Sequence, residues 1–278
     1  MLWATIFFLQ SFGIISQSVI IIILIIILIL LLKIIIIIII IIIINMMNNT
    51  LCLALHASTQ DGIHIDGDIA VSRLPTLRNA DPCVRRGCMW PKATDNKVYV
   101  PYAIANHYSP QEIDLIKRGL NSFSYSTCIR FFPRTNQRDY LYIQSLDGCY
   151  SYVGRQGNTQ TVSLSRRGCI YYGTIQHELL HALGFNHEQC RSDRDQHIQV
   201  ILQNVMKGQE HNFRKIDTLN QGTPYDYGSV MHYGRTAFSK DNYSPTMVAI
   251  PNRNAVFGTA KQMSQNDINR INLLYCRN

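Results

Sequence analysis

The hydrophobic residues of this chain form one nearly continuous run near the N-terminus and short, separated runs in the rest of the sequence. Residues 19–44 are almost entirely Ile and Leu, interrupted by Lys33. A helix of this composition has no polar face, and about 20 apolar residues are enough to span a bilayer. Three interpretations of residues 1–45 stay open: a long secretory signal, an uncleaved signal anchor, or low-complexity sequence from an erroneous gene prediction.

Short runs rich in β-branched and aromatic residues predict the strands of a sheet beyond this segment. We expect strands at 98–104, 128–132, 140–145, 149–153 and 161–164. Pro101 lies in the first of these runs and has no N–H to donate to a neighbouring strand. The sequence therefore places strand 98–104 at an edge of the sheet.

Helices are predicted where a capping pattern precedes apolar residues at helical spacing. Ser109–Glu112 forms a capping box with Pro at the first helical position. A second helix is expected over 174–183, ending at Gly184, and a short third one after a capping pattern at 264–267. Residues 186–262 are rich in Asn, Gln, Gly and Pro and show little periodicity. The pattern as a whole indicates an α+β domain with an irregular C-terminal part.

Composition narrows the classes of function. The formal net charge is +8, but no Lys/Arg block occurs, so we do not expect nucleic-acid binding. About 230 residues remain after the apolar segment, enough for one domain with a short leader. The eight cysteines include no C-x-x-C pair, which favours disulfides in an oxidising compartment over a metal ribbon or a redox site.

The strongest chemical motif is H-E-L-L-H-A-L-G-F-N-H over residues 177–187. His177 and His181 are four residues apart on the predicted helix, so both can reach one metal ion. Gly184 can turn the chain sharply and return His187 as a third ligand. Three protein ligands leave a fourth position open, as catalytic zinc sites do. Glu178 lies beside the metal and is predicted to be the catalytic base.

A second motif, S-V-M-H-Y over residues 229–233, gives the histidine motif its context. Met231 fits the methionine turn that follows the long zinc motif in metzincin proteases. Tyr233 is predicted to place its phenol near the metal and donate a hydrogen bond to the oxyanion of the transition state. Packing of the Tyr233 ring alone is the simpler alternative.

Together these segments resemble the astacin family of metzincins, and within it the fish hatching (choriolytic) enzymes. Four motifs carry the family resemblance: H-E-L-L-H-A-L-G-F-N-H-E at 177–188, R-S-D-R-D at 191–195, Y-D-Y-G-S-V-M-H-Y at 225–233 and C-I-R-F at 128–131. N-A-D-P-C at 79–83 and the Gly-Cys pair at 87–88 resemble the hatching enzymes in particular. The resemblance covers about residues 66–276.

The resemblance implies an architecture and three parts of the chain. The expected fold is an astacin-like α+β domain with a twisted, mostly antiparallel-edged sheet and the active-site helix in its N-terminal lobe. An irregular C-terminal lobe ending in a helix completes it. The peptidase domain is expected over 79–278, after the signal or anchor-like segment at 1–45 and a propeptide at 46–78.

Further roles are implied for individual residues. Asp68 matches the propeptide aspartate that occupies the zinc site before activation, although a simple Asx turn remains the alternative. Activation is expected between Arg78 and Asn79, by a trypsin-like protease. The new amino terminus would then point towards Glu188, which would supply the partner that a buried charge needs. Tyr233 matches the tyrosine that this family places at its zinc.

The resemblance also implies how six cysteines pair and leaves two over. The implied disulfides are Cys128–Cys276, Cys149–Cys169 and Cys83–Cys88. Cys52 would leave with the leader. Cys190 would be a free thiol, a link to another chain or, the interpretation we favour, a small buried residue.

The predicted function is a secreted zinc metalloendopeptidase made as a zymogen, with one Zn²⁺ per chain. The substrate is expected to be an extended protein segment pairing with the edge strand near 149–153, in an egg-envelope protein. The mature form is expected to be a monomer, stored in secretory granules or released directly. A general secreted astacin acting on matrix or digestive substrates is the alternative, and an inactive binding protein is the alternative from another class. Processing proteinases of the family carry further domains after the catalytic one, and the end at Asn278 argues against that subgroup.

Overall fold

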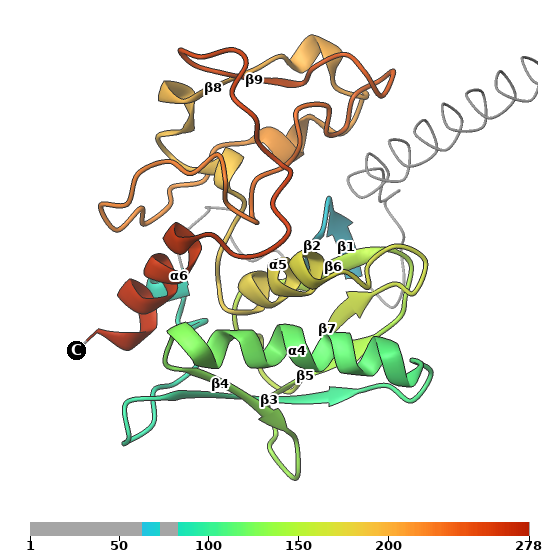
Figure 1. Cartoon of the computed structure of the whole chain (residues 1–278), viewed down its shortest axis with the longest axis vertical. Helices are drawn as coiled ribbons and strands as arrows, with labels where there is room; N and C mark the ends of the chain where they lie inside the picture. Colours follow the sequence, from blue (N-terminus) through green and yellow to red (C-terminus); the bar gives the residue numbers. More distant parts are fainter. Residues whose placement is uncertain (1–62, 73–82, 278) are drawn as a thin grey trace, which may run out of the picture. The chain divides into compact units, whose positions relative to one another are not determined.

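The structure is a computed structural model that describes residues 63–72 and 83–277 (Figure 1). All of them belong to one unit, Cys52–Asn278. The apolar segment at 19–44 and the expected cleavage site between Arg78 and Asn79 lie outside the described residues. No helix within 63–72 and 83–277 has the length and hydropathy that crossing a membrane requires.

A mixed seven-stranded sheet organises the N-terminal part, with the order β1-β2-β6-β7-β5-β3-β4. The α+β class predicted from the sequence is confirmed. β1 pairs with β2, and β6 with β7, in antiparallel fashion, whereas the other neighbours are parallel. The strands are β1 (Ile63–Asp66), β2 (Ile69–Ser72), β3 (Val98–Ile104), β4 (Ile129–Pro133), β5 (Tyr140–Gln144), β6 (Cys149–Tyr152) and β7 (Thr159–Leu164).

The expectation that strand 98–104 lies at an edge is wrong, because β3 lies between β4 and β5. The Val98 N–H donates to Cys128 on the β4 side, whereas the Ala105 N–H donates to Ile143 on the β5 side. Backbone donors alternate between the two neighbours, so the N–H that Pro101 lacks would point towards β5. Pairing with β5 begins only at Tyr102, and the proline therefore costs the ladder no hydrogen bond.

Two helices, α4 (Pro110–Ser126) and α5 (Tyr172–Ala182), run side by side against the sheet (Figure 1). The predicted capping box starts α4: the Glu112 N–H donates to Ser109 Oγ, and the Ser109 N–H donates to the Glu112 carboxylate. Gly119 of α4 allows the close approach, since a Cβ there would lie 2.4 Å from Ile175 Cγ2 on α5. The packing fixes the helix that carries two of the predicted zinc ligands.

The C-terminal part has few regular elements, as its composition predicted, and its own apolar core. The short strands β8 (Ile198–Val200) and β9 (Met247–Ala249), which the sequence did not predict, pair in antiparallel fashion. The last helix, α6 (Gln265–Ile271), starts at the predicted capping box and runs into a final turn, η6 (Asn272–Cys276). The remaining short helices are α3 (Cys83–Arg86), η2 (Glu188–Cys190), η3 (Arg194–Gln196), η4 (Leu202–Asn204) and η5 (Glu210–Phe213).

Three disulfides form among the described residues, and they join the pairs that the family resemblance implied: Cys83–Cys88, Cys128–Cys276 and Cys149–Cys169. Cys128–Cys276 spans 148 positions and connects the entry to β4 with the C-terminal turn. Cys83–Cys88 spans 5 positions. Because a cross-link over a longer loop removes more freedom from the unfolded chain, the two bonds differ in their expected effect on stability.

Replacing Cys128 and Cys276 together by Ser is expected to lower the free energy of unfolding by about 4 to 5 kcal/mol. The matched control, Cys83→Ser with Cys88→Ser, is expected to cost about 2 kcal/mol, because its loop is short. Denaturant titration of the two variants followed by circular dichroism measures both. Equal losses would contradict the loop-length argument.

Candidate active site

Helix α5 and the turn after it bring three histidines together. His177 and His181 lie on one face of α5, four residues apart, and both are buried. The helix ends before Gly184, whose φ of +100° is strained for any residue with a side chain. A Cβ there would also lie 2.9 Å from Cys83 Sγ. The turn at Gly184 returns the chain so that His187 faces the other two imidazoles.

The protonation of these rings follows from their hydrogen bonds. His177 Nδ1 lies 2.7 Å from the Val230 carbonyl oxygen, and His181 Nδ1 lies 2.8 Å from that of Phe185. Carbonyl oxygens only accept, so both Nδ1 atoms carry a proton, and in the neutral form of each ring Nε2 presents a lone pair that can bind a metal. His181 Nε2 lies 3.1 Å from Nε2 of His177 and 3.1 Å from Nε2 of His187. Burial lowers the pKa of His181 to about 4, which keeps its ring neutral.

Asp68 lies against all three histidines. Its Oδ1 is 2.7 Å from His187 Nε2 and 3.5 Å from His181 Nε2, and its Oδ2 is 3.0 Å from His177 Nε2. The Tyr233 hydroxyl donates to Oδ1 over 2.9 Å. The Asp68 carboxylate therefore contacts both the three histidines and Tyr233, which is 165 positions away in the sequence.

The donor set fits zinc. One nitrogen from each histidine and one oxygen of Asp68 lie within 4.8 Å of one another. Lone pairs that face each other without a proton between them repel unless a cation lies among them. Three imidazole nitrogens and one carboxylate oxygen are ligands that Zn²⁺ takes in tetrahedral sites. These four residues would hold it.

A tight hairpin delivers Asp68 to the histidines. Gly67 has a φ of +66° at the turn between β1 and β2. A Cβ on it would lie 2.8 Å from Asn212 Oδ1 and 2.8 Å from the Tyr233 hydroxyl, so only glycine fits without a shift. On the other side, the Ser151 N–H of β6 donates to the Asp68 carbonyl oxygen over 3.0 Å. The turn is thus fixed by both parts of the domain.

Glu178 follows the first histidine and lies within the same buried site. Its side chain is 1% exposed, and Oε2 has no hydrogen-bond partner among the described residues. Burial raises the pKa of Glu178 well above its usual range, and the charge of Asp68 raises it further. A buried carboxyl that shares a site with another carboxylate is a candidate for proton transfer.

The segment after the third histidine holds the methionine turn beneath the site. The Glu188 N–H donates to the Met231 carbonyl, and the Tyr233 N–H donates to Gln189 Oε1, each over 3.0 Å. Met231 is buried among the apolar residues of the main core. The Tyr233 ring lies 4.3 Å from that of His187, measured between centroids. The backbone that carries Tyr233 is therefore fixed to the ligand-bearing segment.

Glu188 is fully buried and binds two arginines. Its Oε1 accepts from Arg191 over 3.0 Å and from the Asp226 N–H over 2.9 Å, and its Oε2 accepts from Arg270 over 2.6 Å. Burial raises the pKa of Glu188, and the charges of Arg270 and Arg191 oppose that rise. A role of Glu188 for a new amino terminus at Asn79 stays a prediction, because residues 73–82 lie outside the described part.

Sequence reasoning missed two side chains of this region, Arg270 and Gln189. Arg270 is a charge placed next to Ile271 in the apolar stripe of the last helix, and such a residue needs a buried partner. That anomaly was the available indication. Nothing in the sequence indicated Gln189, because its side chain accepts a hydrogen bond from the Tyr233 N–H, 44 positions away.

Cys190 is buried and forms no disulfide with any residue that the structure describes. Its thiol donates to the Asn212 carbonyl over 3.3 Å. Burial raises the pKa of the thiol to about 12, so it stays neutral and unreactive. These contacts agree with the small buried residue favoured from the sequence.

Comparison with known proteins identifies the family of this chain. Residues 88–276 match the model of a peptidase family described as Astacin. The chain belongs to this family. Low choriolytic enzyme of Oryzias latipes is 48% identical over 213 residues, 76% of this chain and 77% of that protein. High choriolytic enzyme 1 of the same fish is 46% identical over 218 residues, 78% and 80% of the two chains.

A solved structure supports the same assignment. High choriolytic enzyme 1, described as a hatching enzyme zinc-protease from Oryzias latipes (Medaka fish), matches with a TM-score of 0.69 and 48% identity. The match covers 72% of this chain and all of that one. This astacin is therefore a zinc metalloendopeptidase that acts on protein substrates.

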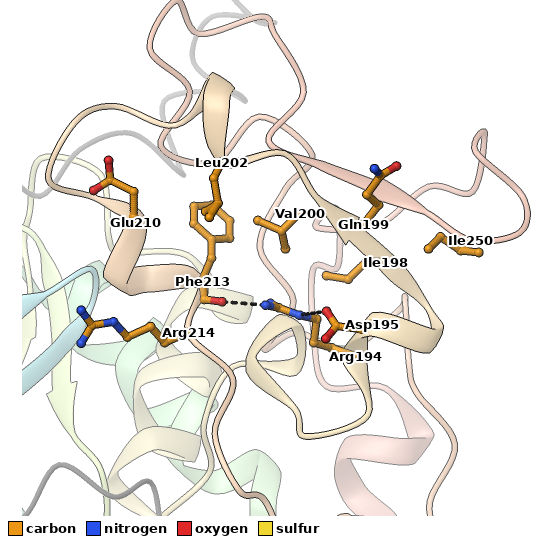
Figure 2. Close-up of a pocket in the computed structure, with 10 residues that line it drawn as sticks. All are labelled: Arg194, Asp195, Ile198, Gln199, Val200, Leu202, Glu210, Phe213, Arg214 and Ile250. Atoms are coloured by element: carbon orange, nitrogen blue, oxygen red, sulfur yellow. Dashed lines mark hydrogen bonds and ion pairs between the residues drawn. The ribbon is translucent and has the colours of Figure 1, made fainter.

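A separate pocket of about 480 Å³ lies in the C-terminal part (Figure 2). Figure 2 shows Arg194 at its base, donating to the Phe213 carbonyl and to Asp195, beside the apolar side chains of Ile198 and Val200. None of its lining residues belongs to the zinc site. All three nitrogens of the Arg194 guanidinium donate hydrogen bonds that hold the surrounding loops.

Proposed function

We propose that this astacin is a secreted zymogen, and that Asp68 keeps its uncut form inactive. The contacts of one carboxylate with all three histidines and with Tyr233 carry this proposal. An oxygen of Asp68 takes the place that a water and then a substrate carbonyl need. Cutting between Arg78 and Asn79 by a trypsin-like protease would separate the hairpin from the catalytic domain.

The chemistry of the cut form can be assigned to named side chains. Zinc, when bound, polarises the scissile carbonyl and acidifies the attacking water. Glu178 accepts the proton of that water and delivers it to the leaving amine. The Tyr233 hydroxyl, released from Asp68, donates a hydrogen bond to the developing oxyanion. The carbonyl oxygens of Val230 and Phe185 orient the rings of His177 and His181, and the Tyr233 ring packs beside that of His187.

The sheet supplies the site for an extended substrate. β6 pairs with β7 on one side and, on the other, only with β2 of the pro-segment among the described strands. Removing that hairpin leaves β6 as an edge strand beside the histidines, where a peptide can pair by strand addition. We infer that the substrate binds there, as the sequence predicted near 149–153.

Egg-envelope protein is the substrate that we propose, on the strength of 46–48% identity to choriolytic enzymes. A general secreted astacin acting on matrix or digestive proteins is the alternative. The test is to express the full chain in eukaryotic cells, identify the new amino terminus after activation and measure zinc content. Release of soluble fragments from isolated egg envelopes, compared with gelatin and casein, then separates the two substrates. A cut, zinc-loaded form that cleaves none of them would contradict the proposal.

Tyr233→Phe is expected to lower kcat of the cut form by about 10- to 100-fold, because the oxyanion loses one donor. The KM for a peptide and the zinc content are expected to change little. The matched control is Tyr227→Phe, which removes a hydroxyl that donates to the His197 carbonyl of the C-terminal part over 2.6 Å. Steady-state kinetics and metal analysis measure both variants. A Tyr233→Phe enzyme as fast as the wild type would show that the ring only packs.

A further inference from the structure

A small apolar cluster joins the pro-segment to the catalytic domain, apart from the main core. Ile65 and Ala70 come from the hairpin, and Tyr150 comes from β6. All three are nearly fully buried, at 5%, 4% and 3% exposure. Leu146 and Tyr152 pack against them and are half-buried. The catalytic domain thus presents three apolar side chains that the hairpin covers in the uncut chain.

Strand pairing fixes where this cluster lies relative to the zinc site. Ile69 is opposite Ser151 and Ala70 is opposite Tyr152 in the parallel pair β2–β6. Ala70 is two residues beyond Asp68, about 7 Å along an extended chain. Tyr150 and Tyr152 are two positions apart on β6, so their side chains point to the same face of the sheet.

We propose that Leu146, Tyr150 and Tyr152 form a subsite that binds an apolar side chain of an extended protein substrate after the pro-segment leaves. The inference rests on the proposed function, since it assumes that the substrate takes the place of β2. In the uncut chain Ile65 and Ala70 fill this subsite, and they show what kind of side chain it accepts. Once the hairpin departs, the three side chains are exposed, and covering them again with an apolar group is favourable.

Peptide cleavage tests the preference. The full chain is cut to its active form and supplied with peptides randomised on both sides of one bond. We expect Leu, Phe or Tyr over Ser at one fixed position a few residues from that bond, by about tenfold in kcat/KM. Leu146→Ser and Tyr152→Ser are each expected to reduce that ratio to about twofold or less. Tyr125→Ser is the matched control, because Tyr125 on α4 is 83% exposed.

Cleavage without any apolar preference, or a preference unchanged in both subsite variants, would overturn the inference and leave the proposed function standing. A second measurement does not depend on catalysis. A synthetic peptide of residues 63–72 is titrated against the cut form carrying Glu178→Gln. We expect the Ile65→Ser version of this peptide to bind about tenfold more weakly, and equal affinities would overturn the subsite even if no peptide were cleaved.

Discussion

Uncut protein carrying Asp68→Ala is expected to cleave peptides that the uncut wild-type chain leaves intact. The wild-type carboxylate is held on the site by the histidines, by Tyr233 and by strand pairing, so it competes with substrate as an intramolecular ligand. Intramolecular ligands gain about 10²- to 10⁴-fold over free ones, and we expect peptidase activity to rise by at least about 100-fold. The comparison is made with Arg78 replaced by Ala in both proteins, which blocks activation at the expected site.

The control for this experiment is Asp66→Ala in the same hairpin. The Asp66 side chain lies 3.6 Å from His211 and does not belong to the group of metal-binding side chains formed by Asp68 and the three histidines. Its loss is expected to loosen the hairpin slightly and to raise activity far less. If the zinc-loaded Asp68→Ala protein stayed as silent as the wild type, inhibition by this carboxylate would be refuted.

Local signals in the sequence predicted the helices and the histidine geometry. The capping boxes at Ser109 and Ser264 mark helix starts because the same few residues both donate and accept the capping hydrogen bonds. The spacing of His177 and His181 fixes their common face, and Gly184 marks the turn. Each of these features depends on residues that are within about one or two helical turns of one another, so the local sequence is enough to predict it.

Long-range pairing explains what could not be predicted from the sequence. Pro101 indicated an edge strand, but β3 pairs with β4 on one side and with β5 on the other. Because pairing with β5 begins at Tyr102, the missing N–H of Pro101 does not prevent it. A turn at Asp68 was among the interpretations of the sequence, but the pairing of its hairpin with β6 could not be predicted. The charge of Arg270 beside the apolar stripe of α6 was visible, but its pairing with Glu188, 82 positions away, was not.

The inhibition that we propose for the hairpin has two components. Asp68 supplies an oxygen to the histidines, while β2 covers the only free side of β6 among the described strands. A substrate needs both places, so removing either contact alone leaves the other in its way. This coupling predicts that Asp68→Ala releases only part of the activity that cutting the chain releases.

Glu178→Gln is expected to abolish peptidase activity of the cut form, with kcat falling by about 10³-fold or more. An amide has nearly the shape of the carboxylate but cannot accept the proton of the attacking water or return it to the leaving amine. Glu178 lies beside the three histidines without being one of the grouped ligands, so zinc content is expected to stay at one per chain. Single-turnover kinetics and metal analysis of the same sample measure the two quantities together.

Glu210→Gln is the matched control, because Glu210 lies at the pocket of the C-terminal part, where its carboxylate accepts a hydrogen bond from the Gly208 N–H. Its kcat is expected to stay within about twofold of the wild type, as surface substitutions usually have small effects. A Glu178→Gln enzyme that kept wild-type kcat would require another base. Among the described residues, Asp68 is the one carboxylate grouped with the three histidines. In the proposed cut form Asp68 would have left with the pro-segment, so no acid–base residue would remain at the histidines and the proposed mechanism would be wrong.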